Sequence, residues 1–205
     1  QSLDYDHRAQ LGNHGWGWDQ VLPYFKRSED YSGTAAQADV YHGVAGPLHV
    51  STVKPTAMCD MYLKACADQG IATVDDLNRG NQKGAAYFDI TVKKGRRHNT
   101  VSAFLKPVRS RKNLTIMKHS LVKRVLFKGK AAVGVEVVCK GKVSNILVRR
   151  EVIISAGTIN SPQLLQLSGI GNKNLLDLHG INTVVDLPGV GENLQDQPLY
   201  LCHGG

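Results

Sequence analysis

The chain has 205 residues, of which 42% are hydrophobic and 20% are charged, a composition typical of a soluble globular protein that can bury one sizeable core. No apolar stretch approaches the length of a membrane span, and the first residues, Gln1-Ser2-Leu3, do not begin a signal peptide. The four cysteines form no CxxC pair and the eight histidines no HxH or HExxH pair, so no metal site is predicted.

The net charge of +8 is concentrated in one block of the chain. Residues 93–150 contain 17 of the 25 Lys and Arg residues and a single acidic residue, Glu136. Such a block has three interpretations: a solvated sheet face, attraction of an anionic cofactor or substrate, or a nucleic-acid surface. The basic residues alternate with Val, Leu and Ile, and aromatic residues are few, which favours the sheet face and argues against nucleic acid.

The first fifty residues are rich in glycine and predict loops, interrupted by one helix over 18–28. Apolar residues at helical spacing indicate this helix. Asp19 is its predicted N-cap, and Pro23 predicts that the helix is short or kinked.

A second helix is expected over 55–69, because apolar residues recur on one side and Gly70 follows as a helix end. Cys59 and Cys66 lie seven positions apart in this segment and are interpreted as buried thiols rather than metal ligands. A polar loop is expected over 75–84.

From residue 114 onward the apolar residues follow the pattern of strands. Four strands are predicted, at 114–117, 122–127, 133–138 and 143–148. Gly129 and Gly141, each between two lysines, supply turns between the last three strands. The sequence therefore predicts an antiparallel meander.

Residues 151–171, EVIISAGTINSPQLLQLSGIG, predict a strand that leads into a helix. The apolar run 152–156 is interpreted as a strand buried on both faces, and it ends at Gly157. Ser161 and Pro162 are the predicted N-cap and first residue of a helix that closes at Ser168-Gly169. A helix N-terminus reached through small residues presents free N–H groups, which favour anions such as a cofactor pyrophosphate.

A short helix over 174–179 and a strand over 183–186 complete the expected elements. His98, His119 and His179 lie in a loop, a strand or a helix end, with no carboxylate at a fixed spacing that would form a catalytic dyad. We therefore expect these histidines to have surface or packing roles.

Residues 157–171 resemble the second signature of the glucose–methanol–choline (GMC) oxidoreductases: small residues, then Ser-Pro, two aliphatic residues and Ser-Gly-aliphatic-Gly. Every constrained position is filled. Four further segments resemble family segments in the same order: 12–30, 41–51, 100–114 and 186–196. The resemblance covers nearly the whole chain and is closest to the insect glucose-dehydrogenase branch. Family members are several hundred residues longer, so the chain is interpreted as an internal fragment.

The resemblance implies an α/β fold, α+β overall: the middle part of a GMC-type FAD-binding domain, with an antiparallel meander, interleaved with pieces of the substrate domain. It divides the chain into a loop-rich connecting region near the flavin (1–50), a substrate-domain piece (51–92), the middle segment of the FAD-binding domain (93–176) and the start of the second substrate-domain piece (177–205).

The implied cofactor is FAD, and the implied reaction is oxidation of an alcohol or sugar by hydride transfer to the flavin, which a quinone or oxygen re-oxidises. The family's adenine contact, a valine backbone, maps onto Val122, which is otherwise an ordinary strand residue. Ala156 and Gly157 follow the apolar run, and small residues there let a cofactor approach the backbone. The GxGxxG turn and the C-terminal catalytic histidine pair of the family do not occur in the sequence, so no catalytic residue is assigned.

Two other functions stay open. A truncated, catalytically inactive paralogue would use its retained surface as an interaction module. A stand-alone nucleic-acid-binding domain is supported only by the net charge. The resemblance is also compatible with an extracellular location.

Overall fold

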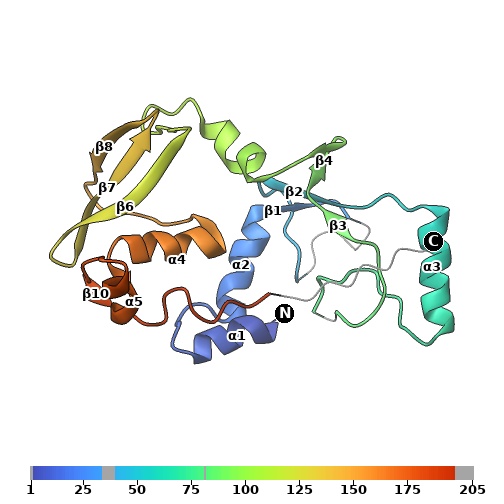
Figure 1. Ribbon diagram of the computed structural model, residues 1–205. Helices are drawn as coiled ribbons and strands as arrows, with labels where there is room; N and C mark the ends of the chain where they lie inside the picture. The colour runs from blue at the N-terminus through green and yellow to red at the C-terminus, as the bar shows by residue number, and fades with distance from the viewer. Residues whose placement is uncertain (1, 34–39, 81, 197–205) are drawn as a thin grey trace. The chain divides into compact units, whose positions relative to one another are not determined.

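The computed structural model describes residues 2–33, 40–80 and 82–196 of the chain (Figure 1). The chain divides into two compact units, Gln1–Thr115 and Ile116–Gly205, which are described separately. None of the helices in the described ranges combines the length and the apolar character that crossing a bilayer requires.

Unit 1 is built around a small sheet with β2 at its centre. Its elements are, in order, α1 (Ser2–Gln10), α2 (Trp18–Ser28), β1 (Glu29–Tyr31), β2 (Leu48–Thr52), α3 (Ala57–Asp68), β3 (Asp89–Ile90), β4 (Val92–Lys93), β5 (Arg96–Arg97), the π-helix η1 (Val101–Leu105) and the 3-10 helix η2 (Lys106–Val108). Strand β2 pairs in parallel with β1 and antiparallel with β3, while β4 and β5 form a hairpin. The parallel pair β1–β2 brings residues far apart in sequence together, and these form the polar cluster described below.

The helix expected over 18–28 is confirmed as α2, with Pro23 inside it. The predicted N-cap is wrong: Gly17 occupies that position, and Asp19 lies in the first turn. The physical reason is that Asp6 of α1 accepts the backbone N–H of Trp18 at 2.9 Å. A carboxylate from a neighbouring helix therefore satisfies a free amide that a local cap would otherwise bind.

The helix expected over 55–69 is confirmed as α3, capped by Thr56, whose hydroxyl oxygen accepts the N–H of Cys59 at 3.3 Å. The burial of its cysteines was predicted wrongly, because Cys59 is exposed and Cys66 is half-buried. No residue of α3 is buried, and Met58 is 75% exposed. Helical periodicity thus identified the helix, although no described element covers its apolar side.

Unit 2 contains the predicted antiparallel meander. Its elements are β6 (Ser120–Lys128), β7 (Ala131–Cys139), β8 (Lys142–Leu147), α4 (Gly157–Leu167), β9 (Ile170–Gly171), α5 (Lys173–Leu178) and β10 (Val185–Asp186). Strands β6, β7 and β8 pair antiparallel in that order, and both turn glycines, Gly129 and Gly141, have positive φ. Such φ values suit tight hairpin turns and cost glycine little. Val125 and Val137 are the most buried residues of the sheet.

Two predicted strands do not form in the structure. Residues 114–117 are irregular, and the apolar run 152–156 also has no regular secondary structure and no strand partner within the described residues. The run is not buried either, since Ile153 is 78% exposed. A strand requires a neighbour that accepts and donates its backbone hydrogen bonds, and apolar composition alone does not supply one.

The helix after this run begins earlier than predicted. Helix α4 starts at Gly157, which has a φ of +91°, so Ser161 and Pro162 lie inside the helix. The Ser161 hydroxyl oxygen, inside the helix, accepts the N–H of Ala156 at 3.0 Å and so stabilises the turn that leads into α4. The predicted closure at Ser168-Gly169 is confirmed.

The last two expected elements are present with small changes. The helix over 174–179 is α5, and Asn172 caps it by accepting the N–H groups of Asn174 and Leu175. The strand expected over 183–186 is the shorter β10, which pairs in parallel with β9.

Candidate functional site

The candidate site is a cavity of about 880 Å³ in unit 2, between the start of β6, the segment 152–156 and one side of α4. Its wall is mostly apolar, with a few polar side chains. The lining residues with polar side chains are Ser120, Lys123, Ser155, Asn160 and Gln163. A pocket of roughly 300–1,000 Å³ with an apolar wall and a few polar groups is typical of small-molecule and cofactor sites.

Two of the three predicted cofactor residues line this cavity. Val122 of β6 and Ala156 at the N-cap of α4 are brought together from distant parts of the sequence. Val122 is half-buried on an edge strand of the described sheet, and the register shifts beside it, between Val122 and Arg124. Edge strands carry backbone N–H and C=O groups that the sheet leaves unpaired, which is what reading a base edge through the backbone requires.

The third predicted residue, Gly157, follows Ala156 at the start of α4. A Cβ atom placed on Gly157 would meet nothing within 4 Å, so open space lies in front of its backbone. The N-cap residue of α4, Ala156, makes no side-chain hydrogen bond to the first turn of the helix. The N–H of Ala156 itself is accepted by the Ser161 hydroxyl oxygen. The positive end of an eleven-residue helix beside open space suits an anionic group. These features fit a dinucleotide cofactor.

The Ser-Gly-Ile-Gly end of the signature holds α4 against the meander. The Ser168 hydroxyl group is buried; it accepts the N–H of Val125 at 2.8 Å and donates to the carbonyl of Leu164 at 2.6 Å. Gly169 has a φ of +88°, and a Cβ there would lie 2.4 Å from the Asn182 carbonyl oxygen. The hydrogen bonds of Ser168 and the close approach of the backbone at Gly169 therefore give both signature residues a structural role beside the cavity.

The segment 186–196 is tied to the same helix. The Gln166 side-chain amide donates to the Val190 carbonyl at 3.1 Å, and a Cβ on Gly191 would lie 2.9 Å from that amide nitrogen. The turn after Pro188 thus packs closely against α4 at Gly191.

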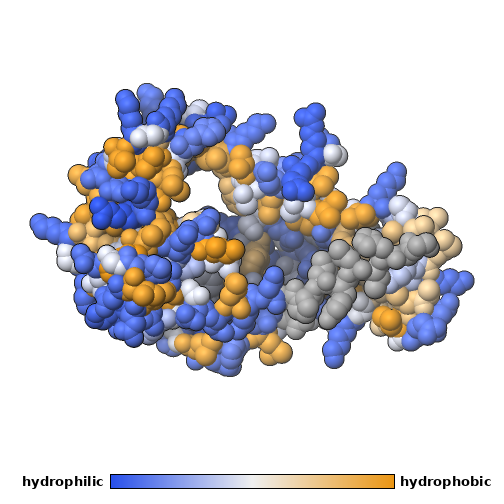
Figure 2. Space-filling model, in the orientation of Figure 1, coloured by the Kyte–Doolittle hydropathy of each residue, from blue (hydrophilic) through white to orange (hydrophobic). Residues whose placement is uncertain are grey.

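The basic block behaves as a solvated surface on the described sheet. In Figure 2, hydrophilic and hydrophobic patches lie side by side in the region of β6, β7 and β8. Glu136, the single acid of the block, accepts from Arg124 at 3.1 Å and lies 3.4 Å from Lys123. The hydrogen bond from Arg124 lowers the pKa of Glu136 below its usual value.

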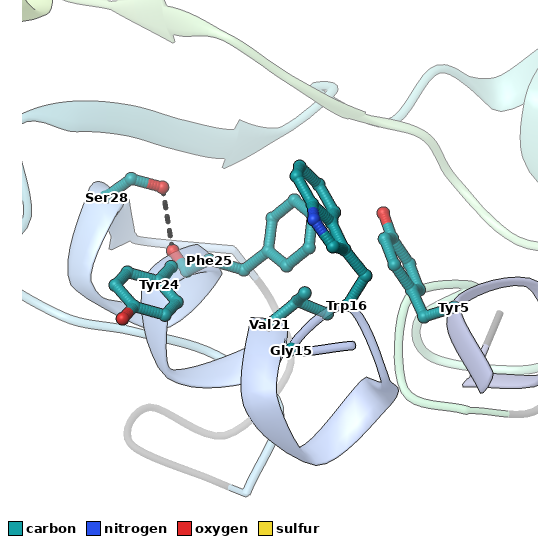
Figure 3. Close-up of a pocket in the computed structure, with 7 residues that line it drawn as sticks. All are labelled: Tyr5, Gly15, Trp16, Val21, Tyr24, Phe25 and Ser28. Carbon is teal, nitrogen blue, oxygen red and sulfur yellow. Dashed lines mark hydrogen bonds between the residues drawn. The ribbon is translucent and has the colours of Figure 1, made fainter. Parts of the chain in front are cut away.

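A second cavity, of about 360 Å³, lies in unit 1 between α1 and α2 (Figure 3). Aromatic rings dominate its wall, and the rings of Tyr5 and Phe25 meet edge to face at 5.6 Å. The Ser28 hydroxyl group donates to the Phe25 carbonyl at 2.8 Å. No carboxylate, imidazole or amine of the described residues lines this cavity, and its titratable side chains are those of Tyr5 and Tyr24.

Sequence reasoning missed two histidine–carboxylate clusters in unit 1. His42 is buried between Glu29 and Asp76, and His49 lies 2.9 Å from Asp30. The hydrogen bond with His49 lowers the pKa of Asp30. No sequence spacing predicts these pairs, because the β1–β2 pairing and the loop after α3 bring their members together. Of the histidines considered from the sequence, His98 accepts the N–H of His49 at 3.1 Å through its Nδ1.

Burial alone would lower the pKa of His42, but hydrogen bonds to Asp76 and Glu29 outweigh it and raise that pKa above its usual value. The described residues contain no group of three or more His, Cys, Asp or Glu side chains arranged to hold a metal ion. The cavity of unit 2 therefore remains the candidate cofactor site.

Comparison with known proteins identifies the family. The model of the GMC oxidoreductase family matches residues 2–199. An oxygen-dependent choline dehydrogenase from Brucella anthropi is 42% identical over 194 residues, which cover 94% of this chain and 35% of that protein. The mitochondrial choline dehydrogenase of Mus musculus is 43% identical over 194 residues, covering 94% of this chain and 32% of that protein.

Among solved structures, an FAD-dependent oxidoreductase from Chaetomium thermophilum matches with a TM-score of 0.87 and 32% identity, covering 94% of this chain and 36% of that one. This match confirms the mixed α/β fold. The chain spans about a third of the length of the curated relatives it matches. The chain belongs to the GMC oxidoreductase family.

Proposed function

We propose that the chain forms the central part of the FAD-binding domain of an oxidoreductase that acts on CH–OH donors. The observation that carries the proposal is the cavity in which Val122 and Ala156 meet beside the open backbone of Gly157. The family membership supports the cofactor, because the structurally similar Chaetomium thermophilum protein is FAD-dependent.

In this proposal each residue has a binding task. The backbone of Val122 contacts the adenine edge, Gly157 lets the cofactor come close to the chain, and the positive end of α4 stabilises the pyrophosphate charge. FAD, when bound, supplies the acceptor for the hydride that leaves the substrate carbon. The base that takes the hydroxyl proton is assigned to a C-terminal family segment rather than to any histidine of this chain.

The division into residues 1–50, 51–92, 93–176 and 177–205 is part of the proposal, since it refers to domains that further family segments complete. The chain on its own would hold FAD weakly, because the GxGxxG pyrophosphate turn is not in its sequence.

The substrate is proposed as a small alcohol or sugar, with a quinone or oxygen as the electron acceptor. Two choline dehydrogenases among the relatives make choline the first substrate to assay. Glucose is the second substrate to assay, because the chain as a whole resembles the insect glucose-dehydrogenase branch of the family.

Flavin binding by the holoenzyme tests the cofactor site. Gly157→Ala adds one methyl group where the protein itself has nothing within 4 Å, but at a φ of +91° it also strains the backbone. A loss of affinity therefore reports a bound group in that space only where it exceeds the loss in a control with the same strain. We expect FAD affinity to fall by about tenfold or more, roughly 1.4 kcal/mol. Gly141→Ala is the matched control: Gly141 also has positive φ and open space, and it lies in the β7–β8 turn outside the cavity lining.

The outcomes separate the proposal from its alternative. If Gly157→Ala and Gly141→Ala both keep the affinity and flavin content of the unmodified protein, the assigned cofactor site is wrong. If the unmodified full protein purifies without flavin and gains none from added FAD, the interaction-module alternative, which the exposed Leu121, Leu147 and Ile153 support, replaces the enzyme proposal.

A further inference from the structure

The most enclosed ionic cluster of the described residues lies in unit 1, and its members do not line the cavity of unit 2. His42 is 4% exposed, and each of its ring nitrogens faces a carboxylate oxygen. Nδ1 lies 3.0 Å from Glu29 Oε2, and Nε2 lies 2.6 Å from Asp76 Oδ2. Since an ionised carboxylate only accepts hydrogen bonds, both contacts form together when both ring nitrogens carry a proton.

The cluster joins three segments of unit 1. Glu29 begins β1, His42 lies in the loop before β2, and Asp76 lies in the loop after α3. Each carboxylate also binds backbone: Glu29 Oε2 accepts the N–H of Gly43 at 2.9 Å, and Asp76 Oδ1 accepts the N–H of Asn78 at 2.6 Å. The charge state of one imidazole thus bears on the position of two loops.

An aromatic side chain stacks on one face of the His42 ring and restrains its orientation. Tyr31, 3% exposed, stacks on His42 with a centroid distance of 3.8 Å and an interplanar angle of 18°. Besides Glu29 and His42, the ionisable side chains among the residues that line their shared 740 Å³ cavity are Tyr5, Tyr41 and Arg79. Because the ring cannot turn without breaking the stack, we expect a carboxylate to move when a ring nitrogen loses its proton.

We propose that Glu29, His42 and Asp76 form a proton-linked clamp: with both ring protons present the clamp joins β1 to the loop after α3, and loss of the Nδ1 proton releases Glu29. Glu29 is the partner that yields because its side chain is 21% exposed and its contact is the longer one. The Asp76 side chain is 0% exposed, so bulk solvent does not reach it to replace the imidazole. The released carboxylate then faces the cavity that Asn78 and Arg79 also line.

The test is an NMR titration of the purified protein labelled with ¹⁵N-histidine, in which His42→Gln identifies the His42 signals. At pH 6 we expect both ring nitrogens of His42 to be protonated. As the pH rises, Nδ1 should lose its proton while Nε2 keeps its own. A neutral His42 at pH 6, or a proton retained on Nδ1 instead, would overturn the clamp.

The titration midpoint of His42 in a conservative Glu29 variant is a measurement that a change in packing alone would not alter. Glu29→Gln keeps a hydrogen-bond acceptor for Nδ1 but removes the charge, so the titration midpoint of His42 should move to lower pH. The matched control is Glu192→Gln, which removes an exposed glutamate of unit 2 and should leave the midpoint unchanged. An unchanged midpoint in Glu29→Gln would show that Glu29 does not hold the proton, and the proposal would fail.

Discussion

Removing the Ser168 hydroxyl group should destabilise unit 2 far more than its size suggests. In Ser168→Ala the N–H of Val125, a residue that is 4% exposed, loses its acceptor at a buried position. Leaving a buried donor unsatisfied costs about 1–3 kcal/mol. The Leu164 carbonyl loses one of its two donors, the Ser168 hydroxyl group, but it still accepts the backbone N–H of Ser168 at 3.1 Å. For a unit the size of Ile116–Gly205, each kcal/mol corresponds to roughly 4–8 °C in Tm.

The assay must follow unit 2 specifically. Both tryptophans, Trp16 and Trp18, belong to unit 1, so intrinsic fluorescence does not report the unfolding of unit 2. Amide hydrogen exchange does, and the Val125 amide itself should exchange faster in the variant. Ser120→Ala is the control, because its hydroxyl group donates only to the exposed Lys118 carbonyl. A loss below about 0.5 kcal/mol in Ser168→Ala, with Val125 still protected, would refute the role assigned to this serine.

Three further predictions follow from the same structure. Gly169→Ala should cost about 2–4 kcal/mol because its Cβ would overlap the Asn182 carbonyl, whereas Gly180→Ala, at a similar φ with open space, should cost only about 1 kcal/mol; equal losses in urea denaturation would argue against the overlap. The raised pKa of His42 means that its stabilisation is complete below the unfolded value of about 6.5 and is lost as the pH rises through the folded pKa. The difference in Tm between the unmodified protein and His42→Gln should therefore shrink over that range, and a difference independent of pH would contradict this. The exposed Cys59 should be alkylated by iodoacetamide before the half-buried Cys139, as peptide mass mapping can determine; the reverse order would contradict the exposure of α3.

The sequence predicted those elements whose signals are local. Glycines with positive φ mark both turns of the meander, so β6, β7 and β8 were predicted in the correct order and orientation. Helices α2, α3 and α5 were found from spacing and end signals. These features depend on neighbours within a few residues, which a single sequence displays.

Most errors concern interactions between distant residues, whereas the misplaced start of α4 depends on a local turn. The apolar run 152–156 has the composition of a buried strand, but no described strand pairs with it. Ser161 and Pro162 have the chemistry of a helix start, yet α4 begins at Gly157 because glycine adopts the positive φ of the turn. For the candidate site, Val122 and Ala156 came from a family resemblance and do share a cavity. The buried His42 was missed because its two partners come from other segments.

The arrangement of the meander also bears on how unit 2 folds. Each of its turns joins strands that are neighbours in sequence, so closing the loops costs little chain entropy. The bond between Val125 and Ser168, in contrast, spans 43 positions. Because local contacts form faster than distant ones, the three strands would assemble first and offer a template on which α4 docks. The cavity that Val122 and Ala156 line would then take shape only once α4 has docked on these strands.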